Sequence, residues 1–497
     1  MKKKILLLNP NKWGRGITSI WIASHSSILK RSGFDVKLFD ATFYENWSDY
    51  EIKINTENKQ FKKTDYLEKI KFKKEDIHKD FEKTVTKFKP DIIFWSALSS
   101  HIHGEGEYIN IEYGHDLVSE IKNFKGLKIC GGIQATADAE ATLNKFRNID
   151  FLVGGESELT LNDIVNCYPN IDKIKKLKGV NYFNKTDKRF VKNQKQEIIK
   201  NLDIISPYDY SIFEKQVFLR PYNGKVLNAI DYEISRGCIY TCSYCVETII
   251  QKYYGFEENN NNGTLFNFKN YLRNKSAKTI FKEITKLNHE LNIQLFRCQD
   301  TNFLTINKTT LLELAELLHN SNLKIKLYIE TRAEGINSKT IELLKKLKVD
   351  GVGMGVELSD QNFRETNLNR FVNQEKIEKA FKLLRDVNIN TTAYNIIGLP
   401  NQTEESIIET IKFNKKINPN VCSVAFYSKY DGTDLTSKAL NNFDKYPKGM
   451  DAQIRSKIIN HNISSNTLNF YKDNFNYLVK TDLKNIEKLK KSYNYEN

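Results

Sequence analysis

The stretch Ser235-Arg-Gly-Cys238-Ile-Tyr-Thr-Cys242-Ser-Tyr-Cys245 places three cysteines on one short loop, directly after a strand-like run at residues 228–234. Three thiolates at this spacing can bind three corners of an iron–sulfur cluster, which leaves the fourth corner open to a ligand that is not protein. A structural zinc site would need a fourth Cys or His close by, and the next cysteine is Cys298. The loop therefore predicts a cluster with an open coordination position.

The aromatic residue before the third cysteine makes this loop more specific. With Tyr244 in that position, the loop resembles the signature of the radical S-adenosylmethionine (SAM) enzymes. The resemblance implies a [4Fe-4S] cluster on Cys238, Cys242 and Cys245, with SAM on the open iron. It also implies reductive cleavage of SAM to a 5'-deoxyadenosyl radical, with electrons from an external donor of the flavodoxin or ferredoxin type.

Residues 229–435 alternate between strand-like and helix-like segments. Six strands are expected, at 231–235, 293–298, 324–330, 351–356, 390–397 and 421–427. Such alternation predicts a parallel sheet, here a partial (β/α)6 barrel with its site at the carboxyl ends of the strands. The run Gly351-Val-Gly-Met-Gly-Val-Glu357 resembles the family's glycine-rich strand, whose glycines would admit the adenosyl group. The resemblance implies SAM contacts at Tyr244, Asp300, Arg332, Glu357 and Gly398.

Residues 1–165 show the same alternation and predict a doubly wound, Rossmann- or flavodoxin-like α/β domain. The first turn, Asn9-Pro-Asn11-Lys-Trp-Gly14, lacks the G-x-G-x-x-G pattern of a dinucleotide site. It resembles the turn of cobalamin-binding domains instead, with Asn11 at the position of the histidine that ligates cobalt. The cobalamin contacts implied by this resemblance are Asn9, Gly14, Ser96, Ser99, Gly131, Gly132, Thr136, Gly154 and Glu156. His101 and His103 are expected to be solvated.

The remaining segments connect or follow these two domains. Residues 166–228 are expected to form a linker that contains a hairpin, with strands near 179–183 and 189–191 around a turn at 184–187. Residues 436–497 are polar and basic and predict a helical cap or tail. The fold class is therefore α/β, with a cobalamin-binding type of domain, a radical SAM barrel and a C-terminal helical segment.

Composition limits the partners and the location. The net charge of +15 comes from lysines scattered along the chain, which indicates a solvated surface and argues against a nucleic-acid interface. No apolar run approaches the ~18 residues of a membrane span. The first apolar run ends at Asn9 after Ile5–Leu8, so a buried strand is expected rather than a signal peptide. With an odd number of cysteines, 7, the chain is expected to be reduced and cytoplasmic.

Together these patterns favour a cobalamin-dependent radical SAM methyltransferase that acts on an unactivated carbon of a small-molecule or peptide substrate. The alternative with the same cofactors is a cyclase or ring-rearranging enzyme that transfers no methyl group. A transfer-RNA methylthiotransferase would need a second cluster in the first domain, and Cys130 and Cys167 cannot supply three ligands. A corrinoid-binding sensor with a vestigial cluster is a further alternative, against which the intact cysteine triad argues.

Overall fold

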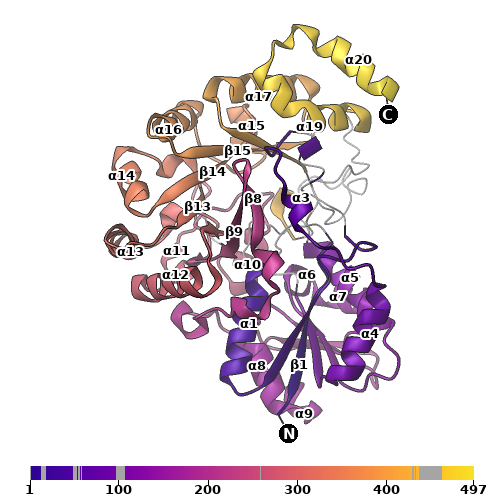
Figure 1. Ribbon diagram of the computed structural model, residues 1–497. Helices are drawn as coiled ribbons and strands as arrows, with labels where there is room; N and C mark the ends of the chain where they lie inside the picture. The colour runs from indigo at the N-terminus through magenta and orange to yellow at the C-terminus, as the bar shows by residue number, and fades with distance from the viewer. Residues whose placement is uncertain are drawn as a thin grey trace.

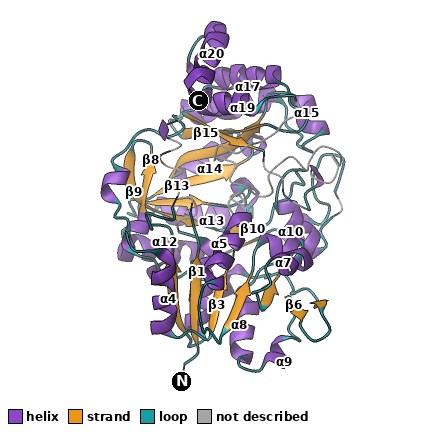
Figure 2. Ribbon diagram, turned by 90° about the vertical axis from the view of Figure 1, so that its right-hand side faces the viewer, coloured by secondary structure: helices purple, strands orange, loops and turns teal. Residues whose placement is uncertain are grey.

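The computed structural model describes residues 2–12, 18–48, 53, 56–57, 59–96, 107–257, 259–427, 430, 432–435 and 462–496. Two seven-stranded sheets dominate them, one in each half of the chain. Figure 2 shows the two sheets one above the other, with the N-terminus below and the C-terminal helices above. The predicted α/β fold, with a doubly wound first domain, a partial barrel and a helical C-terminal segment, is confirmed.

The first sheet has the strand order β2-β1-β3-β4-β5-β6-β7. The first five strands are parallel, with Lys4 opposite Asp35 and Ile5 opposite Ile92. This order places the switch in winding direction between β1 and β3, where open α/β sheets bind ligands. Its strands are β1 Lys4–Asn9, β2 Asp35–Asp40, β3 Ile92–Trp95, β4 Leu127–Cys130, β5 Phe151–Val153, β6 Val180–Asn184 and β7 Arg189–Lys192.

Helices lie on both faces of this sheet (Figure 1). They are α1 Ile20–Arg31, α4 Ile77–Phe88, α5 Glu107–Ser119, α6 Ile133–Ala137, α7 Ala139–Lys145, α8 Glu158–Cys167 and α9 Ile171–Ile174, with α3 Tyr66–Lys69 in the insertion before α4. The hairpin expected in the linker forms β6 and β7, which pair antiparallel and extend the sheet beyond β5. The domain boundaries at residues 165 and 228 stay a prediction.

The second sheet has the order β16-β15-β14-β13-β12-β9-β8. Six of its strands are parallel and correspond to the six expected from the sequence, while β8 pairs antiparallel with β9. The strands are β8 Leu219–Tyr222, β9 Lys225–Tyr232, β12 Leu295–Cys298, β13 Lys326–Thr331, β14 Val349–Glu357, β15 Asn390–Ile397 and β16 Val421–Phe426. A small separate pair, β10 Ser235–Arg236 and β11 Arg273–Asn274, flanks the cysteine loop.

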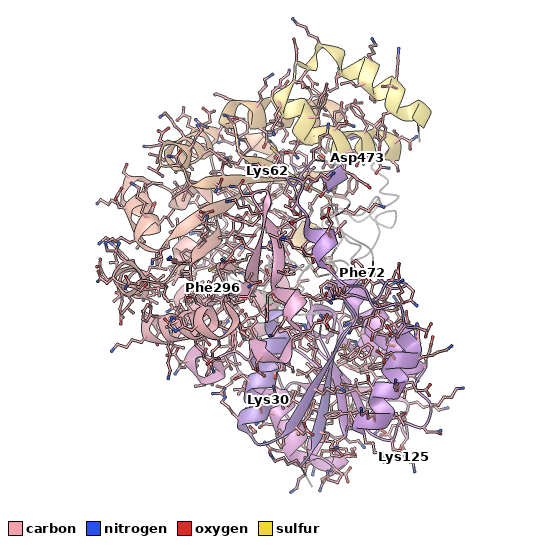
Figure 3. The ribbon with its side chains drawn as sticks, in the orientation of Figure 1. Lys30, Lys62, Phe72, Lys125, Phe296 and Asp473 are labelled. Atoms are coloured by element: carbon pink, nitrogen blue, oxygen red, sulfur yellow. The ribbon has the colours of Figure 1, made fainter. Side chains whose placement is uncertain are left out.

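The helices between these strands cover the outer side of the curved sheet (Figure 1). They are α12 Ala277–Leu291, α13 Lys308–His319, α14 Ser338–Lys346, α16 Gln374–Asp386 and α17 Glu404–Ile417, with α10 Glu247–Tyr254, α11 Phe268–Tyr271 and α15 Gln361–Thr366 in the connecting segments. Helix α12 buries Ile280, Ile284 and Leu287 at a helical spacing, and Phe296 of β12 is fully buried in the same core (Figure 3).

The two edges of the half barrel are covered by other parts of the chain. Lys62, in the insertion of the first half, donates to Asn223 Oδ1 at 2.7 Å in the β8–β9 turn (Figure 3). At the other edge, α19 Ser465–Lys480 packs along β16 and is followed by α20 Ile486–Glu496. Asn476 of α19 accepts from the backbone N–H of Cys422 at 2.9 Å and donates to its carbonyl at 2.7 Å. This amide therefore replaces a neighbouring strand at the exposed edge. No described helix has the length and apolar character of a membrane span.

The strand-like role of Asn476 can be tested with Asn476→Leu. Leucine has the same branching as asparagine, though it is larger, and it leaves two buried backbone groups of Cys422 without partners, so we expect the free energy of unfolding to fall by about 1–3 kcal/mol. Asn474→Leu is the matched control for the added bulk, because Asn474 is half-buried on the same helix and donates to the Phe470 carbonyl of its own helix. Urea denaturation of both variants measures the difference, and equal losses would contradict the role of Asn476.

Candidate active site at the cysteine loop

The cysteine loop leaves β10 through a turn that only glycine fits. Gly237 has a φ of +97°, and a Cβ atom there would lie 2.8 Å from the carbonyl oxygen of Tyr271. Behind the loop, Gln251 of α10 donates to the carbonyl oxygens of Cys238 at 2.9 Å and Tyr240 at 3.0 Å. These contacts tie the loop to the helix that follows it, so the three thiols are held on a fixed backbone.

The three thiols lie in a protected environment. Cys238 and Cys242 are buried and Cys245 is half-buried. Burial raises the pKa of the Cys238 thiol to about 12, and it raises the pKa of Cys245 well above its ordinary value. Two N–H groups point at sulfur: Tyr240 N is 3.4 Å from Cys238 Sγ, and Arg332 Nη1 is 3.6 Å from Cys242 Sγ. Because burial disfavours the charged thiolate, these cysteines would lose their protons only beside a positive charge. A bound metal provides that charge.

The chemistry of the donor set fits an iron–sulfur cluster. In the described residues no three His, Cys, Asp or Glu side chains are placed around a single metal ion. The fit rests instead on the donor type, since three soft sulfurs on one rigid loop are the ligands that iron–sulfur clusters take.

Four charged side chains surround the Cys242 side of the loop. Arg332 pairs with Glu334 at 2.6 Å, and Arg370 lies 3.7 Å from Glu357. Tyr244 donates to Glu357 Oε1 at 2.9 Å, which links the loop to the end of β14. Two guanidinium groups and two carboxylates therefore lie close together. The guanidinium groups can bind the carboxylate of an amino-acid zwitterion, and the carboxylates can accept hydrogen bonds from its amino group.

The bend at the end of β14 positions Glu357. The register with β15 shifts between Gly355 and Glu357, and Glu357 itself has a φ of +62°. A Cβ atom on Gly355 would lie 2.1 Å from Glu357 Oε1. Glycine at this position therefore leaves the space that the Glu357 carboxylate occupies. The expectation that Gly351 and Gly353 lie open for an adenosyl group is wrong. Cβ atoms there would lie 2.5 Å from Tyr222 Oη and 2.6 Å from the Tyr394 ring, because neighbouring tyrosines fill the space.

Asp300 holds the start of the loop. Its Oδ1 accepts from the backbone N–H groups of Ile234 at 3.1 Å and Ser235 at 2.5 Å, and from Ser235 Oγ at 2.6 Å. Its Oδ2 is buried without a hydrogen-bond partner among the described residues, and burial raises the pKa of Asp300 to about 7. The structure therefore gives Asp300 a positioning role. Its SAM contact, and that of Gly398 at the end of β15 with a φ of +75°, stay predictions.

Small polar residues line the carboxyl edge of the first sheet. Asn9 donates to Asp40 Oδ1 at 3.0 Å and Asn11 to Thr42 Oγ1 at 3.1 Å, so the residue at the histidine position is an anchored amide. Gly132, with a φ of +105°, begins the turn into α6, and the buried Ser96 has its hydroxyl beside Gly131. Gly14, Ser99, His101 and His103 lie outside the described residues.

The turn after β5 meets the second half of the chain. A Cβ atom on Gly154 would lie 2.8 Å from the Tyr253 hydroxyl, and one on Gly155 would lie 2.4 Å from the Tyr254 hydroxyl. Gly155 N donates to Thr136 Oγ1 at 2.9 Å. Glu156 accepts from Arg273 Nη1 at 2.7 Å and 3.0 Å. These glycines and Glu156 thus carry contacts between the two halves of the chain, and the predicted contacts of Gly154 and Glu156 with cobalamin stay a prediction.

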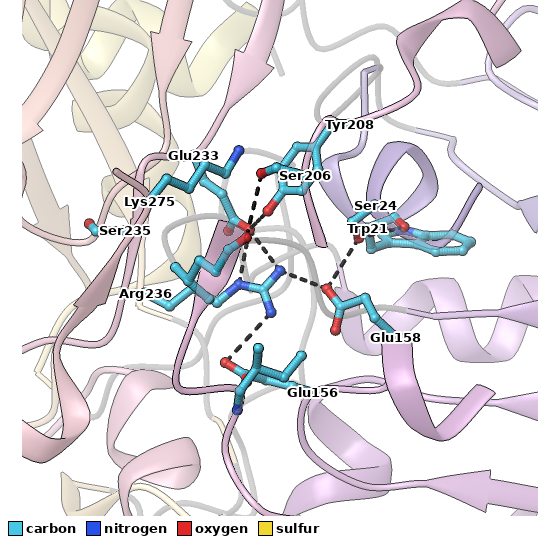
Figure 4. A network of polar contacts seen from close by, with 12 residues as sticks. Trp21, Ser24, Glu156, Glu158, Ser206, Tyr208, Glu233, Ser235, Arg236 and Lys275 are labelled. Atoms are coloured by element: carbon cyan, nitrogen blue, oxygen red, sulfur yellow. Dashed lines mark hydrogen bonds and ion pairs between the residues drawn. The ribbon is translucent and has the colours of Figure 1, made fainter. Parts of the chain in front are cut away.

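A buried ionic network that the sequence did not reveal lies between the two sheets (Figure 4). Arg236, two residues before Cys238, donates to Glu158 at 2.6 Å and to Glu233 at 2.7 Å, and lies 3.6 Å from Glu156. Although burial alone would raise it, Arg236 and His25 lower the pKa of Glu158 to about 2. The guanidinium of Arg236 in β10 therefore joins α8 of the first half to the segment that follows β9 in the second, directly at the base of the cysteine loop.

Comparison with known proteins agrees with this geometry. Residues 232–413 match the model of the radical SAM superfamily. An uncharacterized methyltransferase of Pyrococcus horikoshii is 24% identical over 367 residues, which is 73% of this chain and 72% of that protein. The anaerobic magnesium-protoporphyrin IX monomethyl ester cyclase of Rubrivivax gelatinosus is 27% identical over 362 residues, 71% of this chain. The chain spans 59% of the length of that cyclase.

Two solved structures share the fold of nearly the whole chain. The radical SAM methyltransferase TsrM of Kitasatospora setae, with cobalamin and a [4Fe-4S] cluster bound, superposes with a TM-score of 0.65 at 13% identity. The match covers 90% of this chain and 79% of TsrM. The cobalamin-dependent SAM radical enzyme OxsB superposes with a TM-score of 0.55 at 16% identity, covering 91% of this chain and 57% of OxsB.

These matches identify the class of protein. Residues 232–413 are a radical SAM domain, and the chain is a radical SAM enzyme. The fold of this chain, a doubly wound α/β domain followed by a half barrel, is shared with TsrM and OxsB.

The network around Arg236 predicts a large effect of Arg236→Met. Methionine retains the bulk and leaves three buried carboxylates without their shared cation, so we expect the free energy of unfolding to fall by about 3–5 kcal/mol. Lys382→Met is the control, since Lys382 pairs with Asp386 at 2.6 Å on the surface and should cost at most about 0.5 kcal/mol. Similar denaturation midpoints for the two variants would refute the importance of the network.

The raised pKa of Asp300 predicts a pH-dependent stability. Because the folded-state pKa of about 7 lies above the ordinary value of 3.8, the folded protein binds this proton more tightly than the unfolded chain. The contribution of Asp300 to stability therefore falls as the pH rises from about 4 to about 7, by about 1.4 kcal/mol for each unit of pKa difference.

Asp300→Asn, which cannot ionise, should remove that part of the pH dependence. Thermal or urea unfolding of wild type and variant between pH 4 and pH 8 measures the effect. Parallel stability profiles for the two proteins would show that Asp300 does not titrate in this range.

Proposed function

We propose that the chain is a cobalamin-dependent radical SAM methyltransferase that methylates an unactivated carbon of a small-molecule or peptide substrate. One observation carries the proposal: the carboxyl edge of the first sheet lies against the helix that follows the cysteine loop. Helix α6 begins directly after Gly131–Gly132, and its Ile133 packs in one apolar cluster with Val246, Ile249 and Ile250. A ligand bound at that edge would therefore be a neighbour of the cluster site.

The residues around the loop support SAM binding. When bound, the [4Fe-4S] cluster supplies the electron that cleaves SAM, and cobalamin carries the methyl group. Cys238, Cys242 and Cys245 would hold the cluster, and SAM would take the coordination position that they leave open. Glu357 could accept hydrogen bonds from the SAM amino group, and Arg332 and Arg370 could donate to the SAM carboxylate. The buried surroundings exclude water from the reacting groups.

The first sheet supports a cobalamin site at Asn9, Ser96, Gly131, Gly132 and Thr136. These small residues lie at the carboxyl ends of β1, β3 and β4, on either side of the switch point, which is where open α/β sheets bind ligands. Gln134 Oε1, a buried polar atom of α6, has no hydrogen-bond partner among the described residues. It can accept a hydrogen bond from an amide group on the rim of a corrin ring. Because Asn11 is tied to Thr42, the cobalt would receive no histidine from this turn.

The alternative reaction keeps both cofactors and ends in cyclisation or rearrangement without methyl transfer. The similarity to the Rubrivivax cyclase favours it, as does the 27% identity over 303 residues to the radical SAM cyclopropyl synthase TigE of Paramaledivibacter caminithermalis. The electron donor in either case would be an external protein of the flavodoxin or ferredoxin type.

Product analysis separates the two reactions. The protein is purified without oxygen, reconstituted with iron and sulfide, and supplied with hydroxocobalamin, SAM and a chemical reductant. Methyl transfer yields S-adenosylhomocysteine alongside 5'-deoxyadenosine once a substrate is present, whereas cyclisation yields 5'-deoxyadenosine without S-adenosylhomocysteine. A colourless protein with stoichiometric zinc in the cysteine loop would contradict both.

The cluster site predicts a specific effect of Cys242→Ala. Removing one of three sulfur ligands should abolish the brown colour and reduce SAM cleavage to the background level, as measured by absorbance and by 5'-deoxyadenosine formation. Cys298→Ala is the matched control, because Cys298 is a fully buried thiol in the apolar core of β12 and should retain both properties. An unchanged cluster spectrum in Cys242→Ala would refute the site.

A further inference from the structure

We infer that Arg332 raises the reduction potential of the cluster through its hydrogen bond to Cys242. The inference rests on the proposed function, since it requires a cluster on the cysteine loop. Its basis is the 3.6 Å contact between Arg332 Nη1 and Cys242 Sγ, in which both residues are buried. Arg332 would then set the reduction potential of the cluster through Cys242, in addition to binding SAM.

The guanidinium of Arg332 is fixed on three sides. Its Nε and Nη2 both donate to Glu334 Oε1, at 3.0 Å and 2.6 Å. One face of the guanidinium lies 3.7 Å from the centroid of the Tyr240 ring, a residue of the cysteine loop itself. Glu334 binds Nε and Nη2 of Arg332, and Tyr240 covers one face of the guanidinium. In this orientation the remaining nitrogen, Nη1, donates to Cys242 Sγ. The direction of this N–H group is therefore set by the fold and does not depend on a bound ligand.

An N–H group aimed at a cluster sulfur favours the reduced state. Reduction adds one negative charge to the cluster and its thiolate ligands, and a donor that points at that charge stabilises it. Because the site is buried, the interaction is weakly screened. The carboxylate of Glu334 lies on the far side of the guanidinium from the sulfur contact, so the pair acts as a dipole with its positive end toward Cys242.

Arg370 provides an internal comparison. It is equally buried and belongs to the same group of charges. However, its Nη2 donates to the Gly355 carbonyl at 2.6 Å, and its nearest carboxylate is Glu357. Arg370 therefore contributes charge to the pocket without a hydrogen bond to sulfur in the described structure, and its removal should affect the cluster less than removal of Arg332.

The test is a potentiometric titration of the reconstituted full chain, followed by electron paramagnetic resonance, in the absence of SAM, cobalamin and substrate. In Arg332→Gln, the ratio of reduced to oxidised cluster at a fixed potential should fall about tenfold, which is about 59 mV for a one-electron couple. Arg370→Gln should shift the ratio less. Iron and sulfide content, measured for each protein, establishes that the clusters compared are equally loaded.

Arg332→Lys serves if the glutamine variant does not retain its cluster. Lysine keeps the charge and loses the planar fork that aims an N–H group at the sulfur, so the reduction potential of this variant should lie below that of wild type. A wild-type potential in every loaded Arg332 variant, or an equal shift in Arg370→Gln, would overturn the inference. A wild-type protein without any iron–sulfur signal would overturn the proposed function and this inference with it.

Discussion

The guanidinium of Arg236 is the group on which the arrangement of the two sheets depends. It is buried, and its partners come from both halves of the chain: Glu156 and Glu158 from the end of the first sheet, and Glu233 from the second. A charge removed from water is tolerated only when it is fully paired. The pairing is complete only when the two halves are docked, and docking at this point also fixes the base of the cysteine loop two residues later.

Neighbouring charges extend the same constraint. Arg273 of β11 binds Glu156, and Lys275 pairs with Glu283 at 2.9 Å beneath the ring of Tyr208. Replacing both members of a buried ion pair by apolar residues often leaves a protein equally stable. We therefore assign these pairs a role in fixing how the two halves dock rather than in adding stability. The contacts of Arg236 and Arg273 with Glu156 and Glu158 form when the two halves are docked as observed, whereas Lys275 and Glu283 both belong to the second half. A metal cofactor that must be reduced beside a second cofactor requires that kind of fixed separation.

The fold and the position of the cysteine loop could be predicted from the sequence because local patterns encode them, whereas the ligand roles of the three cysteines stay a prediction. Apolar runs ending in Gly, Ser or Asn gave the parallel strands, and the spacing of three cysteines gave the loop. The ionic contacts were not readable, since Arg236 and Glu158 lie 78 positions apart and no spacing rule joins them. Arg370 was missed for a related reason. It follows a short helix rather than a strand end, and only the tertiary fold brings it to Glu357.

Two glycine pairs that look alike in the sequence have different uses in the structure. Gly154–Gly155 admits the rings of Tyr253 and Tyr254, so the turn after β5 fixes the distance between the first sheet and α10. A Cβ atom on Gly131 would lie 3.3–3.5 Å from atoms of Phe94, Ser96 and Ser157, a close contact that is less severe than the contacts at Gly154 and Gly155. The turn after β4 is therefore less tightly enclosed than the turn after β5. On the proposed function, the turn after β5 sets the spacing between the two cofactors, and the turn after β4 lies where the second cofactor would bind.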